Sequence, residues 1–257
     1  EFQVWPQAQV DEALEEPVFL APRREPSLAP LLARRLNRGG SPPLIRTTLD
    51  AGLQQRLEDL LLGWRARLPE RTSAAILVVE HESMAVRAYL GSVDISDTAR
   101  FGHVDMVRAL RSPGSTLKPF VYALGFDEGL IHPETLIEDR PAAFGRWQPQ
   151  NFDHHFRGTV SLRNALVWSL NIPVVKLAEA LGPNRVAQAL ERGGIALRLP
   201  QDRPGLALVL GGGGVTLEGL AQGYAALARG GHGIAGQDRF GTQGLAQGLQ
   251  KFLGGHD

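Results

Sequence analysis

Apolar residues recur at intervals of three and four in several parts of the chain. From Leu53 to Leu68 the leucines and Trp64 follow this spacing, with Asp50 before them as a candidate cap and Pro69 after them as a stop. The pattern predicts one amphipathic helix. Similar spacing predicts further helices over about 115–126, 162–171, 173–181, 184–192 and 216–229.

Two short apolar runs predict a β-hairpin. Residues 74–79 and 86–91 are rich in β-branched and apolar side chains, and a polar run lies between them. Residues 132–160 contain three prolines and no clear period, so we expect a loop there. The predicted helices and hairpin together indicate an α/β domain, in which an antiparallel sheet that begins with the hairpin lies against a layer of helices.

The two ends of the chain differ from its middle. Residues 1–43 contain seven prolines and scattered charges, which predicts a linker that follows an absent upstream domain. Residues 44–231 form the predicted domain, and residues 232–257 are rich in glycine and glutamine and predict an irregular tail. The chain starts without Met or a signal-peptide pattern, so we expect any membrane anchor upstream of residue 1.

The amino-acid composition excludes some classes of function but does not indicate a particular one. Lysine and arginine together number 27, as do aspartate and glutamate, so no net charge points to nucleic acid. The absence of cysteine excludes disulfides, thiolate metal sites and a cysteine nucleophile. The adjacent His154 and His155 point apart in a regular backbone and have no ligand partner four residues on, so we expect a polar loop rather than a metal site.

The first candidate for chemistry is the pair Ser115 and Lys118. A serine three residues before a lysine, at a helix start after Pro113-Gly114, places hydroxyl and amine on one face within hydrogen-bond reach. Lysine is scarce in this chain, since Lys176 and Lys251 are the only others. The alternative is a helix-capping serine beside a solvated lysine, which four residues alone would favour.

The second candidate is Ser169-Leu170-Asn171, at the junction between two predicted helices. Its alternative is simple helix termination before Pro173, and taken alone the two interpretations are about equally good. The glycine run 211–214 lacks the Gly-Lys-Ser/Thr of a phosphate-binding loop, so it predicts a tight turn before the last helix, with Thr216 as the helix cap.

The two candidate motifs occur together in one protein family. The ten residues from Arg111 to Phe120, RSPGSTLKPF, resemble the nucleophile segment of the class A, bifunctional penicillin-binding proteins. S-x-x-K and S-x-N motifs belong to these enzymes, and Ser115–Lys118 and Ser169–Asn171 match them. Other matching stretches follow in the family's order, over about residues 1–231: 45–50, 104–106, 149–153, 156–158 and 208–224.

The resemblance implies a penicillin-binding, serine β-lactamase-like transpeptidase fold and a D,D-transpeptidase activity. Ser115 would attack the penultimate D-Ala carbonyl of a peptidoglycan stem peptide, release the terminal D-Ala and pass the acyl group to an amine on a neighbouring strand. Lys118 would be the base, with a pKa lowered by burial or by a neighbouring cation. Ser169 would relay a proton to the leaving nitrogen, and Asn171 would bond to Lys118 or to the substrate amide.

The same resemblance implies the partners and the location. We expect peptidoglycan stem peptides and β-lactams as ligands, with no nucleic acid, no cofactor and no metal. The full-length protein would be anchored in the bacterial inner membrane, with this domain on the periplasmic side.

One departure from the family leaves alternatives open. Its third motif, Lys-Thr/Ser-Gly on an edge strand, is missing after the last predicted helix, so we expect a domain truncated at its C-terminus. Two alternatives to a transpeptidase are a hydrolase of the same fold, either a serine β-lactamase or a D,D-carboxypeptidase, and a non-catalytic fragment.

Overall fold

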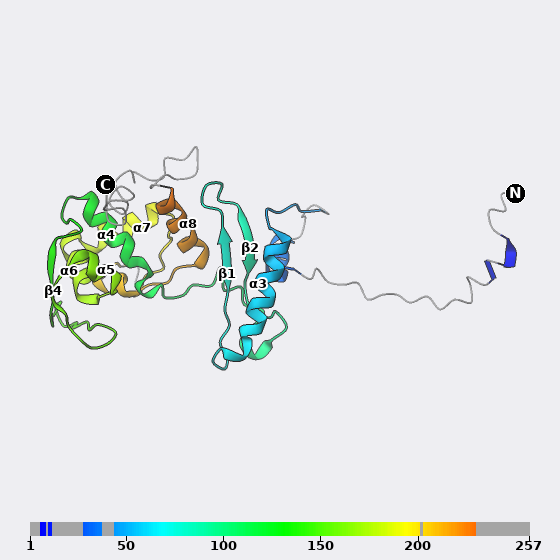
Figure 1. The fold of residues 1–257 in the computed structure, drawn as a ribbon, viewed down its shortest axis with the longest axis horizontal. Helices are drawn as coiled ribbons and strands as arrows, with labels where there is room; N and C mark the ends of the chain where they lie inside the picture. Colours follow the sequence, from blue (N-terminus) through cyan, green and yellow to red (C-terminus); the bar gives the residue numbers. More distant parts are fainter. Residues whose placement is uncertain (1–5, 9, 12–27, 38–43, 201–202, 230–257) are drawn as a thin grey trace.

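The computed structural model describes residues 6–8, 10–11, 28–37, 44–200 and 203–229. In Figure 1, a hairpin with one long helix against it stands beside a larger group of helices. The helices and strands are, in chain order, α2 (Pro30–Leu36), α3 (Ala51–Trp64), β1 (Ile76–Val79), β2 (Val86–Leu90), α4 (Lys118–Asp127), β3 (Leu136–Asp139), β4 (Gly158–Ser161), α5 (Leu162–Val167), α6 (Asn171–Leu181), α7 (Pro183–Arg192) and α8 (Leu217–Ala228). Short 3-10 turns include η1 (Arg65–Arg67), η2 (Thr98–Arg100), η3 (Gly114–Leu117) and η5 (Leu206–Leu210).

The predicted hairpin is confirmed. β1 and β2 pair antiparallel, with Ile76 opposite Leu90 and Val79 opposite Val86. The predicted helix after Asp50 is also confirmed as α3, although η1 takes the place of its last turn. The Asp50 carboxylate accepts a hydrogen bond from the backbone N–H three residues on, at 2.8 Å, so the cap is a local device that sequence alone reveals.

Gln54 joins α3 to the free edge of β2. Its side chain is fully buried, and its Oε1 accepts from the Tyr89 N–H at 2.8 Å while its Nε2 donates to the Tyr89 carbonyl at 3.0 Å. The same Nε2 donates to Glu58 at 2.7 Å. The amide therefore pairs with β2 as a neighbouring strand would, and the backbone groups of this edge stay satisfied.

The main core is built around α4 and α6. Val121 and Tyr122 of α4 have no exposed surface, nor does Val174 of α6. A Cβ atom at Gly125 would lie 2.8 Å from a methyl group of Ile131 and 3.0 Å from one of Leu177 in α6, so α4 and α6 pack closely here and a larger residue would displace these side chains. The start of α4, which carries Lys118, is thereby fixed by the packing of the whole helix.

A second hairpin corrects the expectation of a loop over residues 132–160. β3 and β4 pair antiparallel, with Leu136 opposite Ser161 and Asp139 opposite Gly158. Each strand is only four residues long and mixes polar with apolar positions, so neither gives a clear period of two. In the described residues the strands thus form two separate two-stranded sheets rather than one sheet.

One part of the expected linker, the helix α2, packs against the domain. α2 contacts β2, Leu31 is buried, and Arg35 forms an ion pair with Glu218 of α8 at 3.2 Å. The boundary at residue 43 stays a prediction, and the expected tail, 232–257, lies outside the described residues. Among the residues described, no helix has the length and hydropathy needed to cross a bilayer.

The turn and cap predicted for the last helix are confirmed. Glycines 211–214 precede α8, and the Thr216 hydroxyl accepts from the Gly219 N–H at 3.0 Å. The turn also pairs with the segment before Ser115, because Arg111 and Val215 exchange two backbone hydrogen bonds at 2.9 Å. α8 and its leading turn therefore lie against the segment that enters the candidate site.

We expect the Gln54→Ala variant to lose about 2–3 kcal/mol of unfolding free energy, because the change leaves buried backbone groups of β2 unpaired. Urea unfolding followed by circular dichroism measures this loss. Gln55→Ala is the matched control on the same helix, since Gln55 is exposed and its side chain donates to Asp59 on the surface of α3. Equal stability of the two variants would show that the Gln54 amide does not hold the strand edge.

Candidate active site

Ser115 lies in the 3-10 turn η3, immediately before α4. Gly114 reaches this turn with a φ of 54°, which glycine adopts without strain. A Cβ at Gly211 would lie 2.5 Å from the Ser112 hydroxyl and 2.6 Å from the Gly114 N–H, so the glycine turn packs directly on the turn that carries Ser115. The Ser115 side chain itself is exposed.

A hydrogen bond from α8 also holds this turn. The Tyr224 hydroxyl donates to the Thr116 carbonyl at 2.8 Å. The ring of Tyr224 meets that of Phe120 edge to face, with centroids 5.1 Å apart. The position of Ser115 is therefore set from two sides, by the glycine turn and by α8.

Lys118 is buried, with only 1% of its surface exposed. Its Nζ donates to four oxygens: the Ser169 carbonyl at 2.6 Å, the Ser169 hydroxyl at 3.1 Å, the Leu170 carbonyl at 3.2 Å and Asn171 Oδ1 at 2.6 Å. All four are uncharged, so no carboxylate offsets the loss of water. Desolvation by burial lowers the pKa of Lys118 from 10.5 to about 8.

The hydrogen bond that the spacing of Ser115 and Lys118 would allow is not formed in the described residues. Among the described residues the Lys118 amine bonds only to oxygens of the 169–171 segment, and the Ser115 hydroxyl has no hydrogen bond. The chain changes from a 3-10 turn to an α-helix between the two residues, which alters the offset of an i, i+3 pair. Burial then turns the amine toward the oxygens that can satisfy its N–H groups.

Ser169 takes a backbone conformation that usually belongs to glycine. Its φ is 53°, and it follows the end of α5. Its N–H donates to the Leu166 carbonyl, and the Leu170 N–H donates to the Ala165 carbonyl, both at 2.9 Å. These bonds make a Schellman motif, in which the left-handed residue ends the helix. The helix predicted to reach residue 171 therefore stops at Val167.

Asn171 is the first residue of α6, and all its polar side-chain atoms are engaged. Its Oδ1 accepts from Lys118, its Nδ2 donates to the Gln150 carbonyl at 2.7 Å, and its backbone N–H donates to Asn151 Oδ1 at 2.7 Å. Of the two roles expected for Asn171, the structure contains the bond to Lys118.

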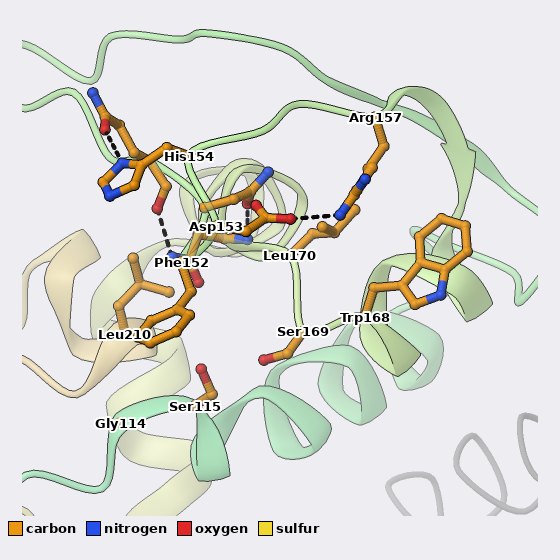
Figure 2. A pocket seen from close by; sticks show the side chains of 13 residues that line it. Gly114, Ser115, Phe152, Asp153, His154, Arg157, Trp168, Ser169, Leu170 and Leu210 are labelled. Atoms are coloured by element: carbon orange, nitrogen blue, oxygen red, sulfur yellow. Dashed lines mark hydrogen bonds and ion pairs between the residues drawn. The ribbon is translucent and has the colours of Figure 1, made fainter.

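A cleft of about 760 Å³ opens over these residues. In Figure 2 the hydroxyls of Ser115 and Ser169 point toward one another from opposite sides of the cleft. Phe152 and Leu210 lie side by side above Ser115, and Trp168 stands at the far end. Sequence reasoning treated Phe152 only as part of a matching stretch and passed over Trp168, because an exposed aromatic residue in a loop has no periodic signal.

The histidines beside the cleft form no metal site in the described residues. His154 lines the cleft and its Nδ1 shares a hydrogen bond with Gln150 at 2.8 Å, whereas the ring of His155 bonds to the Asp153 carbonyl at 2.6 Å. Nowhere in the described ranges do three or more potential ligands cluster in a way that could hold a metal ion. The polar loop expected here is what the structure contains.

Comparison with known proteins identifies the family. The family model "Penicillin binding protein transpeptidase domain" matches residues 74–234. The chain belongs to the penicillin-binding protein transpeptidase family. It is 53% identical to penicillin-binding protein 1C of Escherichia coli (strain K12), over 92% of this chain, and 30% identical to penicillin-binding protein 1A of Rickettsia felis, over 73% of this chain. The resemblance to class A penicillin-binding proteins, predicted from the motifs, is confirmed.

The chain spans 30% of the E. coli relative and 24% of the Rickettsia one. Solved structures support the fold: the penicillin-binding protein PonA1 of Mycobacterium tuberculosis aligns with a TM-score of 0.65 at 24% identity, covering 74% of this chain and 51% of that one. The predicted penicillin-binding transpeptidase fold is therefore confirmed. The structure of PonA1 in complex with penicillin V also aligns with this chain, with a TM-score of 0.64.

We expect Lys118 to titrate with a midpoint near pH 8, since its burial disfavours the charged amine. The chain has only three lysines, so carbon-labelled lysine gives few NMR signals, and Lys118→Met identifies the right one. The folded protein then binds fewer protons than the unfolded chain between about pH 8 and 10.5, and this group makes stability rise with pH over that window. A midpoint at 10.5 would contradict the burial.

We expect Ser169→Gly to be about 1 kcal/mol more stable than Ser169→Ala, because a left-handed backbone strains any residue with a Cβ. Both variants lack the hydroxyl, so their difference isolates the backbone effect. Thermal unfolding of the pair, at one pH and salt concentration, gives the value. Equal melting temperatures would mean that the Schellman turn carries no strain.

Proposed function

We propose that this chain is the acyl-serine domain of a D,D-transpeptidase that cross-links peptidoglycan stem peptides and is acylated by β-lactams. The observation that carries the proposal is the buried Lys118, which bonds to Ser169 and Asn171, two residues that line one cleft together with Ser115. Membership of the penicillin-binding transpeptidase family supports a serine acyltransferase role in peptidoglycan synthesis.

In the proposed reaction, Ser115 attacks the penultimate D-Ala carbonyl and forms an acyl-enzyme. A serine hydroxyl is a weak nucleophile until a base takes its proton, and an amine with a pKa near 8 is a base for a useful fraction of the time at neutral pH. Ser169 contacts Lys118 at 3.1 Å and faces Ser115, so it suits a relay between the base and the leaving nitrogen. An amine of a second strand then accepts the acyl group.

The Ser115 N–H suits the developing oxyanion. It lies in η3, just before α4, and no hydrogen bond within the described residues uses it. A backbone donor aimed at the reacting carbonyl stabilises the tetrahedral intermediate. The second donor would come from the Lys-Thr/Ser-Gly strand of the family, and this sequence has no such motif.

The hydrolase alternative needs a base for a deacylating water, and the cleft offers poor support for one. Asp153 is the only carboxylate among the described residues that line it. The backbone N–H of His155 and the guanidinium of Arg157 engage this carboxylate and lower its pKa. An occupied carboxylate of low pKa is a weak general base, which favours a long-lived acyl-enzyme.

The proposal includes the cellular setting. Relatives of this chain are bacterial penicillin-binding proteins. We therefore propose that the full-length protein is anchored in the inner membrane with this domain on the periplasmic side, where its proposed ligands, stem peptides and β-lactams, are found.

The test is intact-mass analysis after exposure to a labelled penicillin. We expect one persistent adduct, mapped to Ser115, which Ser115→Ala abolishes. Ser112→Ala is the matched control and should keep the adduct, because the Ser112 hydroxyl donates to the Gly211 carbonyl instead of facing the cleft.

Each alternative predicts a different result in the same experiment. A β-lactamase or carboxypeptidase would release the label quickly, and a non-catalytic fragment would take up none. Labelling that persists in Ser115→Ala would show that another residue is the nucleophile.

A further inference from the structure

Two buried polar side chains stand behind the site without an assigned role. Asp139 at the end of β3 has no exposed surface, and Asn151 in the following loop has 3%. Burying a carboxylate and an amide is costly unless their hydrogen bonds are complete. Their partners are therefore informative.

Asp139 accepts every hydrogen bond that reaches it. Its two oxygens accept from Asn151 Nδ2 at 3.0 and 2.9 Å, and its Oδ2 also accepts from the Arg157 N–H at 2.8 Å. A carboxylate fits these contacts because both its oxygens accept hydrogen bonds. An asparagine at position 139 would instead place its own NH₂ group against a donor. The end of β3 is itself fixed, because Lys176 of α6 donates to the Glu138 carbonyl at 2.7 Å.

These contacts decide which way the Asn151 amide faces. Its Nδ2 is used by Asp139 and by the His155 carbonyl at 2.8 Å, so its Oδ1 must point to the other side. There Oδ1 accepts from the Asn171 N–H at 2.7 Å. That N–H belongs to the first turn of α6 and has no partner within the helix.

The same logic reaches Lys118 in one more step. With its backbone N–H on Asn151 and its Nδ2 on the Gln150 carbonyl, Asn171 can present only Oδ1 to the lysine. That oxygen accepts from Nζ at 2.6 Å. Each donor and acceptor along the path therefore has its direction set by the one before it, starting at the Asp139 carboxylate.

We propose that Asp139 and Asn151 are positioning residues, which fix the orientation of Asn171 and thereby hold Lys118 where it takes the proton of the nucleophile. The inference rests on the proposed function, because it concerns the base of that reaction. Neither residue touches the reacting atoms, so each acts only through Asn171.

Charge alone does not account for this arrangement. Every partner of Lys118 Nζ in the described chain is an uncharged oxygen, from the turn between α5 and α6 or from Asn171 at the start of α6. The titratable groups that line the cleft, Asp153, His154 and Arg157, all belong to the loop between β3 and β4, and none of them bonds to the amine. In the described residues, Asp139 is therefore connected to Lys118 by hydrogen bonds, through Asn151 and Asn171.

The first experiment compares acylation by a labelled penicillin in three variants. Asp139→Asn should lower the first-order acylation rate about tenfold or more, as expected for a misplaced base, and leave the preceding binding constant unchanged. The exchange Asp139→Asn with Asn151→Asp restores a donor–acceptor pair between positions 139 and 151 and keeps an acceptor for the Asn171 N–H, although the His155 carbonyl loses its donor, so it should recover part of the rate. Asp105→Asn is the control, since Asp105 is a loop carboxylate bonded to Tyr89 and the Val107 N–H, away from the cleft.

The second experiment measures the pKa of Lys118 directly and needs no acylation. In Asp139→Asn, an Asn171 amide that has turned points its donor at Lys118, so the pKa of Lys118 should fall below its value near 8 in the lysine NMR titration. Asn151→Ala keeps the charge of Asp139 and breaks the path, so it should shift the midpoint in the same direction. It also replaces Asp139→Asn if that variant does not fold.

The outcomes separate the two proposals. If Asp139→Asn and Asn151→Ala match the unmodified chain in both rate and titration, the positioning role is wrong. It is also wrong if Asp105→Asn moves the Lys118 midpoint as far, because the effect would then be a general loss of stability. If the unmodified chain forms no adduct while the midpoint still moves in Asp139→Asn, the proposed function fails, and what stands is only that Asp139 orients Asn171 and Lys118.

Discussion

The burial of one lysine without a carboxylate is the constraint on which the site depends. A charged amine that loses its water must find other acceptors or lose its proton. Lys118 does both in part, because four neutral oxygens surround it and its pKa still falls to about 8. A nearby carboxylate would have kept the amine charged and made it a poorer base, so the neutral partners favour the role of base that we propose for Lys118.

That constraint explains much of the surrounding architecture. The four oxygens belong to residues 169–171, at the junction between α5 and α6. The distance between this junction and α4 must therefore stay constant. The contact of α4 with α6 at Gly125 sets this distance on one side. The loop that follows β3 sets it on the other, through Asn151 and Gln150. A change in these packings would remove acceptors from a buried amine, and each N–H left without an acceptor costs on the order of 1–3 kcal/mol.

The sequence predicted those features whose cause is local. The Asp50 cap, the hairpin at 76–90 and the Thr216 cap each depend on residues within a few positions, and all three are confirmed. The four candidate residues Ser115, Lys118, Ser169 and Asn171 do come together at one cleft. Their catalytic roles stay a proposal.

The sequence did not predict what depends on distant packing. The direction of the Lys118 side chain is decided by oxygens more than fifty residues away. The pairing of Asp139 with Asn151 depends on a hairpin whose strands are too short to show a period. The early end of α5 was not predicted for a different reason. Glycine usually indicates a Schellman turn in a sequence, and here a serine occupies that position.

That serine has a consequence for anyone who engineers this fold. Replacing a left-handed residue at a helix end by glycine is among the simplest routes to a more stable protein. A design procedure that ranks substitutions by stability would therefore select position 169, and in doing so it would remove the hydroxyl that contacts Lys118 at 3.1 Å. One stabilising change, glycine at position 169, would therefore remove a hydroxyl that the proposed reaction uses, so selection for stability and selection for the proposed activity would act in opposite directions at this residue.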